Sequence, residues 1–224
     1  MSFWEYVDDR HHQLLVDACR HAGTVFPCTV VAAVLGVGIA LAARGSERAG
    51  TLATAATGVF LTVPALALLG LLIPLMGPGP APAATLLTLC GLLPIVRNSV
   101  LGLRAVDPSR VRAARVVGMA RPARLVRVEL PVAWPSILAG IRTSTRLLMG
   151  VAAITAYASG PGLGNEIRRG LGSPDGENAL NQVLAGTLGI VALSLLFDAG
   201  YLLLGRLTIP GRPTAPAQPE EKRT

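Results

Sequence analysis

Residues 107–131 read DPSRVRAARVVGMARPARLVRVELP, and this polar stretch separates two long apolar halves of the chain. From Arg104 to Arg127 the sequence carries seven arginines against a single acid, Asp107. Charges at this density are not expected inside the hydrocarbon core of a membrane. We therefore predict that the stretch forms a water-facing loop between membrane spans.

The loop carries the signals of two short helices joined by a tight turn. Asp107 is a favourable N-cap and the proline after it fits the first helical position, so a helix is predicted over residues 108–117. Gly118 can adopt the left-handed conformation that ends such a helix. The Arg-Pro pair at 121–122 restarts a helix, and Pro131 is predicted to end it.

The first of these helices has a surface suited to contact with another protein. Val111, Ala114 and Val117 share one face, while the arginines point elsewhere. Ala113, Ala114 and Gly118 are small, so another backbone can approach closely. A loop that needed only solubility would not require two capped helices. We therefore interpret the loop as a docking element.

The composition indicates an all-α integral membrane protein. The 224 residues are 51% hydrophobic and only 4% aromatic, with a mean hydropathy of +0.54. Soluble domains of this size rarely carry so much aliphatic content. The apolar residues occur in runs of about 20, which matches a hydrocarbon layer of ~30 Å. The three cysteines, Cys19, Cys28 and Cys90, lie far apart and predict neither a disulfide framework nor a zinc site.

Five transmembrane helices are predicted, and a charged turn, a glycine-proline turn or a loop separates each from the next. Their approximate ranges are 22–43, 51–76, 83–103, 136–158 and 183–205. Pro64 lies near the middle of the second span and is predicted to kink or break it. Residues 1–21 are predicted to form an external amphipathic helix at the membrane interface, and the Pro-rich tail over 206–224 to be disordered.

The distribution of charge predicts the orientation. Cytoplasmic loops carry an excess of Lys and Arg, so the arginine-rich loop is assigned to the cytoplasm. Five spans then place Arg44, Arg48 and the C-terminal tail on the same side. The opposite side receives residues 1–21, with two arginines against four acids, and residues 159–182, with two against three. The N-terminus is predicted outside and the C-terminus inside.

Charged residues inside the predicted spans are expected to pair. Asp198 is expected roughly 10 Å into the membrane from the cytoplasmic end of the fifth span, and Arg142 and Arg97 reach similar depths on their own spans. An isolated charge at this depth is costly. We therefore predict that Asp198 contacts Arg142 or Arg97, with Arg146 a less favoured partner one turn deeper. In the alternative, each arginine extends separately to the headgroups.

The sequence argues against an enzyme. All three histidines lie in the first 21 residues, and no predicted span contains two carboxylates. Their spacing also disfavours a metal site with Cys19. The only lysine is Lys222, so the chain has no Gly-Lys-Ser/Thr phosphate loop. Any energy for work must therefore come from a partner chain or from a gradient, and a gradient-driven carrier or channel subunit stays open at this point.

The loop resembles the Glu-Ala-Ala/Gly/Leu-Pro loop of permease subunits in bacterial binding-protein-dependent ABC importers. The residues that carry the resemblance are Arg112-Ala113-Ala114, Gly118 and Leu130-Pro131. Further stretches are similar to the subfamily that imports glycine betaine, carnitine, choline and related osmoprotectants. They are TVPALALL at 62–69, LPIVRNS at 93–99, LAGIRT at 138–143 and GPGLG at 160–164. The resemblance covers about residues 20–205, and related amino-acid permeases share parts of it.

The resemblance implies a type I ABC importer permease fold over 22–205, with a cytoplasmic coupling loop at 104–135. The coupling loop is expected to dock on a cytoplasmic ATPase, which binds ATP and Mg, so this chain needs no cofactor and no metal of its own. A second permease, an extracytoplasmic binding protein and the lipid bilayer are the other expected partners, and nucleic acid is not one. The chain itself is expected to supply the path for an osmoprotectant, or for an amino acid or other small solute. Candidate path or structural residues are Pro64, Arg97, Arg142 and Asp198.

One residue departs from the family pattern. The loop of the family begins with Glu, and Arg112 stands at that position here. An arginine cannot make the contacts of a carboxylate. Either the ATPase carries a compensating acid, or the chain pairs with a second permease that retains the Glu. A homodimer and a heterodimer are both consistent with this reading.

Overall fold

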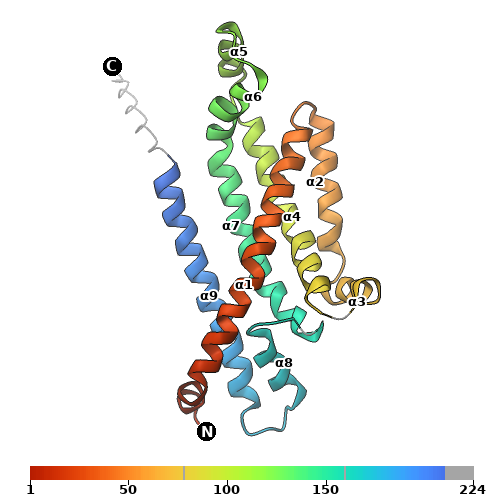
Figure 1. Cartoon of the computed structure of the whole chain (residues 1–224), viewed down its shortest axis with the longest axis vertical. Coiled ribbons are helices and arrows are strands. Elements are labelled where there is room, and N and C mark those ends of the chain that lie inside the picture. Colours follow the sequence, from red (N-terminus) through yellow and green to blue (C-terminus); the bar gives the residue numbers. More distant parts are fainter. Residues whose placement is uncertain (78, 159, 210–224) are drawn as a thin grey trace, which may run out of the picture.

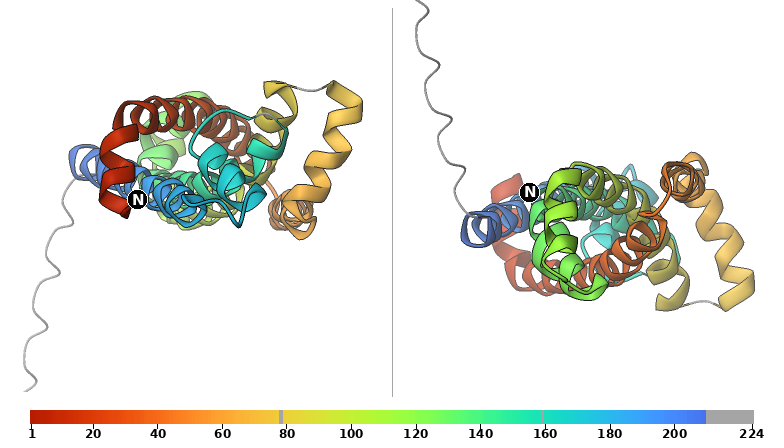
Figure 2. Two further views of the ribbon diagram at one scale, coloured as in Figure 1. Left: turned by 90° about the horizontal axis from the view of Figure 1, so that it is seen from below. Right: turned by 90° about the horizontal axis from the view of Figure 1, so that it is seen from above.

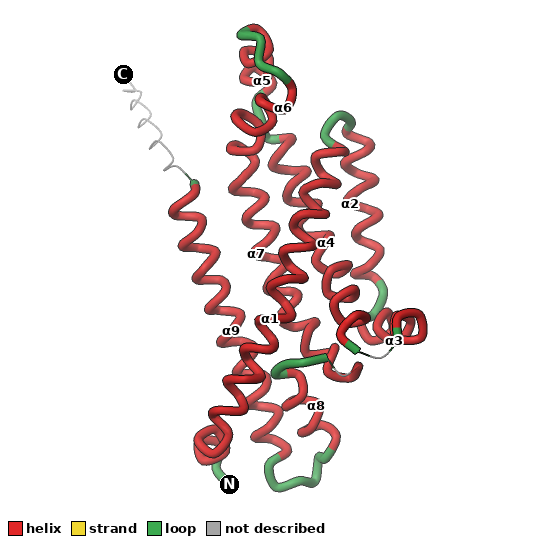
Figure 3. The backbone as a smooth tube through the Cα atoms, viewed as in Figure 1, coloured by secondary structure: helices red, strands yellow, loops and turns green. Residues whose placement is uncertain are grey.

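We analysed a computed structural model that describes residues 1–77, 79–158 and 160–209. Within these residues every regular element is a helix (Figure 3). The elements are α1 (Phe3–Ala43), α2 (Glu47–Thr62), α3 (Ala65–Met76), α4 (Pro80–Arg104), α5 (Pro108–Val116), α6 (Arg121–Arg124), the π-helix η1 (Leu125–Glu129), α7 (Leu130–Ile154), the 3₁₀-helix η2 (Thr155–Ala158), α8 (Gly164–Gly172) and α9 (Ala179–Thr208). The all-α prediction is confirmed for the described part of the chain.

Helices α1, α4 and α7 form the centre of the bundle, and small residues let α4 and α7 approach closely (Figure 1). A Cβ added to Gly140 of α7 would lie 2.9 Å from the carbonyl oxygen of Pro94 on α4. One added to Gly102 of α4 would lie 2.9 Å from the carbonyl oxygen of Ala133 on α7. The Ser144 hydroxyl also donates to the carbonyl oxygen of Gly91 at 3.0 Å. In lipid, where apolar burial drives helix association only weakly, this close packing holds the central pair together.

The second predicted span is broken at Pro64, as expected from its sequence. Helix α2 ends at Thr62, Val63 is extended, and α3 begins after the proline at an angle of 90° to α2. Proline disfavours a helical conformation in the residue before it, which explains the extended Val63. Viewed along the bundle, α3 lies at one edge and α9 at the opposite edge (Figure 2).

The chain crosses the bundle five times when α2 and α3 are counted as one bent span. The other four crossings are α1, α4, α9 and the helix that runs from Arg121 to Ala158, and each is long and apolar enough to span a membrane. The N-terminus lies at the end opposite α5, and the last turn of α9 points toward the α5 end (Figure 1). The prediction of termini at opposite ends is confirmed. The end that carries α5 is the cytoplasmic end by its excess of arginine.

Two segment boundaries differ from those predicted. Residues 1–21 are helical, but they are not a separate element, because α1 runs without a break from Phe3 to Ala43. The change from polar to apolar residues near position 21 alters the environment of the helix and not its backbone hydrogen bonds. At the other terminus α9 continues to Thr208, and the rest of the predicted tail, 210–224, lies outside the described residues.

Candidate functional site

Helix α5 has the two caps that its sequence predicts. The Asp107 carboxylate accepts a hydrogen bond from the Ser109 amide at 2.7 Å. The Ser109 hydroxyl first, and this amide second, lower the pKa of Asp107 below its ordinary value. At the other end Gly118 has φ of +74°. Its amide donates to Arg115 and the next amide, of Met119, donates to Ala114, each at 3.0 Å. This pair of bonds is a Schellman motif, which ends a helix on a left-handed glycine.

The structure divides the predicted coupling residues between an inner and an outer face. Ala114 is buried and Val111 half-buried, so this side of α5 packs against the chain itself. Ala113, Arg112 and Gly118 are exposed. Val117 is also exposed, so the three-residue apolar face predicted with Val111 and Ala114 extends over only two of them. A partner that approaches α5 from solvent therefore meets Ala113 and Arg112 and not Ala114.

The second helix of the loop does not end at Pro131, which corrects the prediction. Helix α6, η1 and α7 follow one another without a break, so the predicted helix-turn-helix runs directly into a membrane span. Leu130 and Pro131 are the first two residues of α7. Proline is tolerated in the first turn of a helix, and the widened π turn before it, with the Leu130 amide donating to Leu125, shifts the hydrogen-bond register there.

A buried acid that the sequence analysis did not single out ties this loop to the body of the protein. Glu129, the last residue of η1, is 9% exposed. One of its oxygens accepts from Nε of Arg124 at 3.1 Å, and the other lies 3.7 Å from Nε of Arg44, at the end of α1. Arg124 is buried as well. The cytoplasmic end of α1 is therefore linked to the loop through a carboxylate, and only the spatial arrangement reveals it.

Loss of the Asp107 cap is expected to loosen α5 without unfolding the bundle. In Asp107→Ala the first helical amides lose their side-chain acceptor, whereas Asp107→Asn keeps one. Amide hydrogen exchange in residues 109–112 should therefore rise several-fold in Asp107→Ala and change little in Asp107→Asn. Because the folded pKa is lowered, the ionised cap is present at neutral pH and is lost as the pH falls through that pKa. Equal exchange in both variants would contradict a capping role.

Inside the membrane, Asp198 of α9 pairs with α7 as predicted. Arg142 donates to both carboxylate oxygens of Asp198, and Arg146 reaches the same carboxylate. Arg146 is therefore a full partner and not the lesser one expected. Arg97 is exposed and takes part in no ion pair among the described residues, so the prediction that it could pair with Asp198 is wrong. Depth along a span was predictable, but the direction in which Arg97 points was not.

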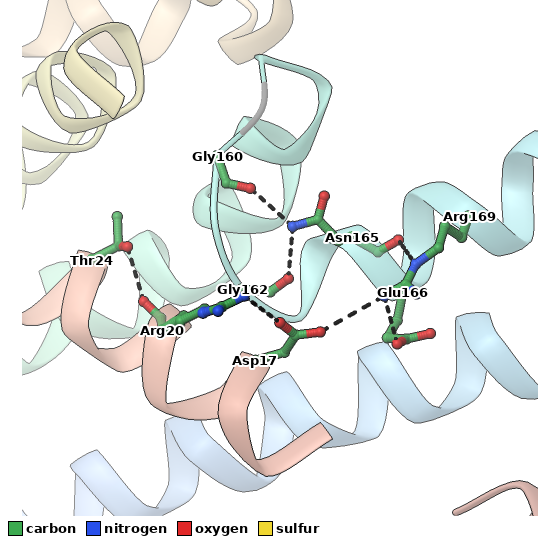
Figure 4. Close-up of polar contacts among 8 residues, drawn as sticks. All are labelled: Asp17, Arg20, Thr24, Gly160, Gly162, Asn165, Glu166 and Arg169. Carbon is green, nitrogen blue, oxygen red and sulfur yellow. Dashed lines mark hydrogen bonds and ion pairs between the residues drawn. The ribbon is translucent and has the colours of Figure 1, made fainter. Parts of the chain in front are cut away.

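A second buried charged cluster joins α1 to α8 at the outer end (Figure 4). Glu166 of α8 is fully buried, accepts from Arg169 at 2.7 Å and accepts from the Tyr6 hydroxyl at 3.0 Å. Asp17 of α1 lies 3.7 Å from the same arginine. The side-chain amide of Asn165, on α8, donates to the carbonyl oxygens of Gly160 and Gly162. The N-terminal half of α1 is therefore docked on the outer loop.

The glycine turn at 160–164 serves close packing. Gly162 has φ of +118°, and a Cβ there would lie 2.9 Å from Nδ1 of His21. Nε2 of His21 lies 3.1 Å from the carbonyl oxygen of Met149. His21 thus fills the contact between α1, α7 and the outer loop. Among the described residues no group of three or more His, Cys, Asp or Glu is placed to hold a metal ion.

The cytoplasmic loop, the pair of Asp198 with α7, and the outer cluster are three positions where helices are tied together by charged side chains. Together they link α1, α7, α8 and α9, so a movement of the cytoplasmic loop can be passed on to several helices.

Comparison with known proteins supports this assignment. Residues 33–209 match the family model described as "Binding-protein-dependent transport system inner membrane component". The choline transport system permease protein OpuBB of Bacillus subtilis is 36% identical over 76% of this chain and 78% of its own length. The osmoprotectant import permease protein OsmW of Salmonella typhimurium is 35% identical over 93% of this chain and 96% of its own. The carnitine transport permease protein OpuCB of Listeria monocytogenes is 30% identical over 90% and 89%.

Solved structures show the same fold at lower identity. An inward-facing structure of the MetNI methionine ABC transporter aligns with a TM-score of 0.78 over 94% of this chain and 100% of that chain, at 18% identity. An amino acid ABC transporter solved with histidines aligns with a TM-score of 0.66 over 92% and 97%, at 19% identity. Likeness at this identity establishes the helical arrangement.

Proposed function

This chain belongs to the family of binding-protein-dependent transport system inner membrane components, and from that premise we propose that it forms the path of an ATP-driven importer for a quaternary-ammonium osmoprotectant. It is a multi-pass membrane permease subunit and not an enzyme. The observation that carries the substrate class is the set of relatives at 30–36% identity over most of the chain, whose names specify choline, carnitine or osmoprotectants.

The proposal assigns energy and selectivity to partner chains. An ATPase on the cytoplasmic side binds ATP and Mg and hydrolyses the nucleotide, while an extracytoplasmic binding protein selects the substrate. A second permease copy or a paralogue completes the path, and this chain binds no cofactor. The scarcity of aromatic side chains supports this division, because quaternary ammonium groups are usually held by aromatic cages.

In this mechanism the loop around α5 receives the movement of the ATPase. The Schellman turn keeps α5 rigid up to Gly118, and η1 continues directly into α7. Glu129 bonds Arg124 and lies near Arg44, so displacement of the loop acts on α7 and on α1 together. Because Arg142 of α7 is bonded to Asp198 of α9, a movement of α7 also moves α9. Pro64 and Arg97 remain candidates for lining the path.

Reconstitution tests the proposal directly. The purified chain alone in liposomes is expected neither to bind radiolabelled glycine betaine, carnitine or choline tightly nor to move them. Addition of the ATPase, the binding protein and ATP should restore uptake, and exchange of the binding protein should change which compound enters. Substrate-specific flux through the chain without ATPase would instead establish a gradient-driven carrier.

A further inference from the structure

We propose that the groove on the ATPase that receives α5 carries a carboxylate opposite Arg112. The permease then supplies the positive partner of the ion pair and the ATPase the negative one. In the family pattern the permease supplies a Glu at this position, whereas here it supplies an arginine. The inference rests on the proposed function, because it needs an ATPase as the occupant. It adds the chemistry by which that partner is chosen.

The position of Arg112 on α5 is the first observation. Successive helical residues are separated by 100°, so the buried pair Val111 and Ala114 defines the inner side of α5. The side directly opposite is centred on Val116, which is 86% exposed. Arg112 precedes it by four residues and therefore lies beside it on the outward face. A groove that covers this face covers the Arg112 side chain.

The charge around Arg112 is the second observation. Three arginines of α5, Arg110, Arg112 and Arg115, are exposed, and none takes part in an ion pair among the residues that the structure describes. The nearest acid in sequence, Asp107, is engaged with the Ser109 amide. The buried acid Glu129 is satisfied by Arg124 and Arg44. Asp107 attracts Arg110 and Arg112 electrostatically but forms no ion pair with either, so among the described residues no acid is in direct contact with Arg112.

The apolar neighbours of Arg112 indicate that its guanidinium loses water when a partner binds α5. Val116 and Val117 are exposed at 86% and 76%, and the space around Gly118 is open, with no atom within 4 Å of an added Cβ. Burial of these residues removes water from the arginine beside them. A guanidinium that loses its water without gaining a carboxylate is strongly unfavourable, whereas a paired one adds specificity. The ATPase groove therefore needs apolar side chains to contact Val116 and Val117 and a carboxylate to pair with Arg112.

Charge reversal in the assembled transporter tests this inference. The full chain, affinity-tagged, is co-expressed with its own ATPase, and the ATPase retained per permease is measured in detergent at low and high salt. We expect Arg112→Glu to retain about tenfold less ATPase or worse, because a close charge pair becomes a repulsive one. Arg112→Ala should fall between the two. Arg48→Glu, the same charge change at an exposed position of α2 outside the coupling loop, serves as the matched control and should retain the wild-type amount.

A reciprocal change identifies the partner acid. Each Asp and Glu of the ATPase groove is changed to Arg and combined with Arg112→Glu, and one of these changes should restore retention. If Arg112→Glu, monodisperse in detergent, retains as much ATPase as the wild type, the charge pair is wrong while the importer function stands. If Arg112→Glu and Arg48→Glu weaken retention equally, the cytoplasmic surface attracts the partner only by general charge, and the specific pair is also wrong. If the wild-type chain retains no ATPase, both the inference and the proposed function fail.

Discussion

The change Asp198→Asn is expected to detach the cytoplasmic half of α9 and to abolish most transport. It leaves Arg142 and Arg146 inside the membrane without an acid, and charges at that depth must pair or reach water. Helix α9 buries few residues, so polar contacts with α7 hold much of it in place. Thermal unfolding of the purified variant should shift down by several degrees, and uptake by the reconstituted importer should fall several-fold.

The two arginines give this prediction an internal control. The Arg142 side chain is 29% exposed and donates to both carboxylate oxygens, whereas the Arg146 side chain is 51% exposed and contacts one of them, so Arg142 depends more on the acid. Arg142→Gln should therefore rescue Asp198→Asn in part, and Arg146→Gln should rescue it less. Arg97→Gln should give no rescue, because Arg97 lies apart from the pair. Wild-type stability and uptake in Asp198→Asn would show that the ion pairs of Asp198 contribute neither to stability nor to transport.

The change Gly118→Arg is expected to uncouple ATP hydrolysis from transport while the protein still folds and inserts. With φ of +74°, a non-glycine residue at 118 costs about 1–2 kcal/mol locally, but an added Cβ meets no atom of this chain within 4 Å. The new side chain therefore leaves the backbone of α5 on its open side, where a partner would meet it. Uptake by the complete importer should fall about tenfold or more, while ATP hydrolysis by the assembled complex should fall less.

A second substitution separates bulk from backbone conformation. Asparagine tolerates the left-handed conformation better than arginine does, so Gly118→Asn should retain most uptake. Both variants should reach the membrane in equal amounts, as measured by quantitative blotting of membrane fractions. Normal uptake and normal ATPase assembly in Gly118→Arg would exclude Gly118 from the docking surface.

The parts of the fold that could be predicted are those fixed by backbone chemistry. Asp107 and Gly118 act within one turn of the helix they cap, so α5 follows from its own residues. Pro64 breaks a span because it lacks an amide hydrogen and constrains the residue before it. The prediction that Pro131 ends a helix was wrong, because the backbone chemistry of proline permits two outcomes. A proline ends a helix or begins one, and the π turn before it decides which.

The site residues that could not be predicted depend on distant partners. Glu129 and Glu166 look like ordinary charged positions, and their burial appears only when Arg44 and Tyr6 are brought to them. The pairing of Asp198 with Arg142 was predictable because the membrane limits the choices at a given depth. Arg97 has the right depth, but its rotation about α4 is set by packing against several helices, which the sequence of one span does not contain.

Helix α1 is attached to other elements near both of its ends. Arg44, directly after its last residue, is tied to the cytoplasmic loop, while Tyr6, near its first residue, donates a hydrogen bond to Glu166 of α8. Pro27 lies between the two attachments and is the one place where the helical ladder lacks an amide. We therefore expect the flexibility of α1 at Pro27 to determine how much of a movement of the cytoplasmic loop reaches α8 at the outer end.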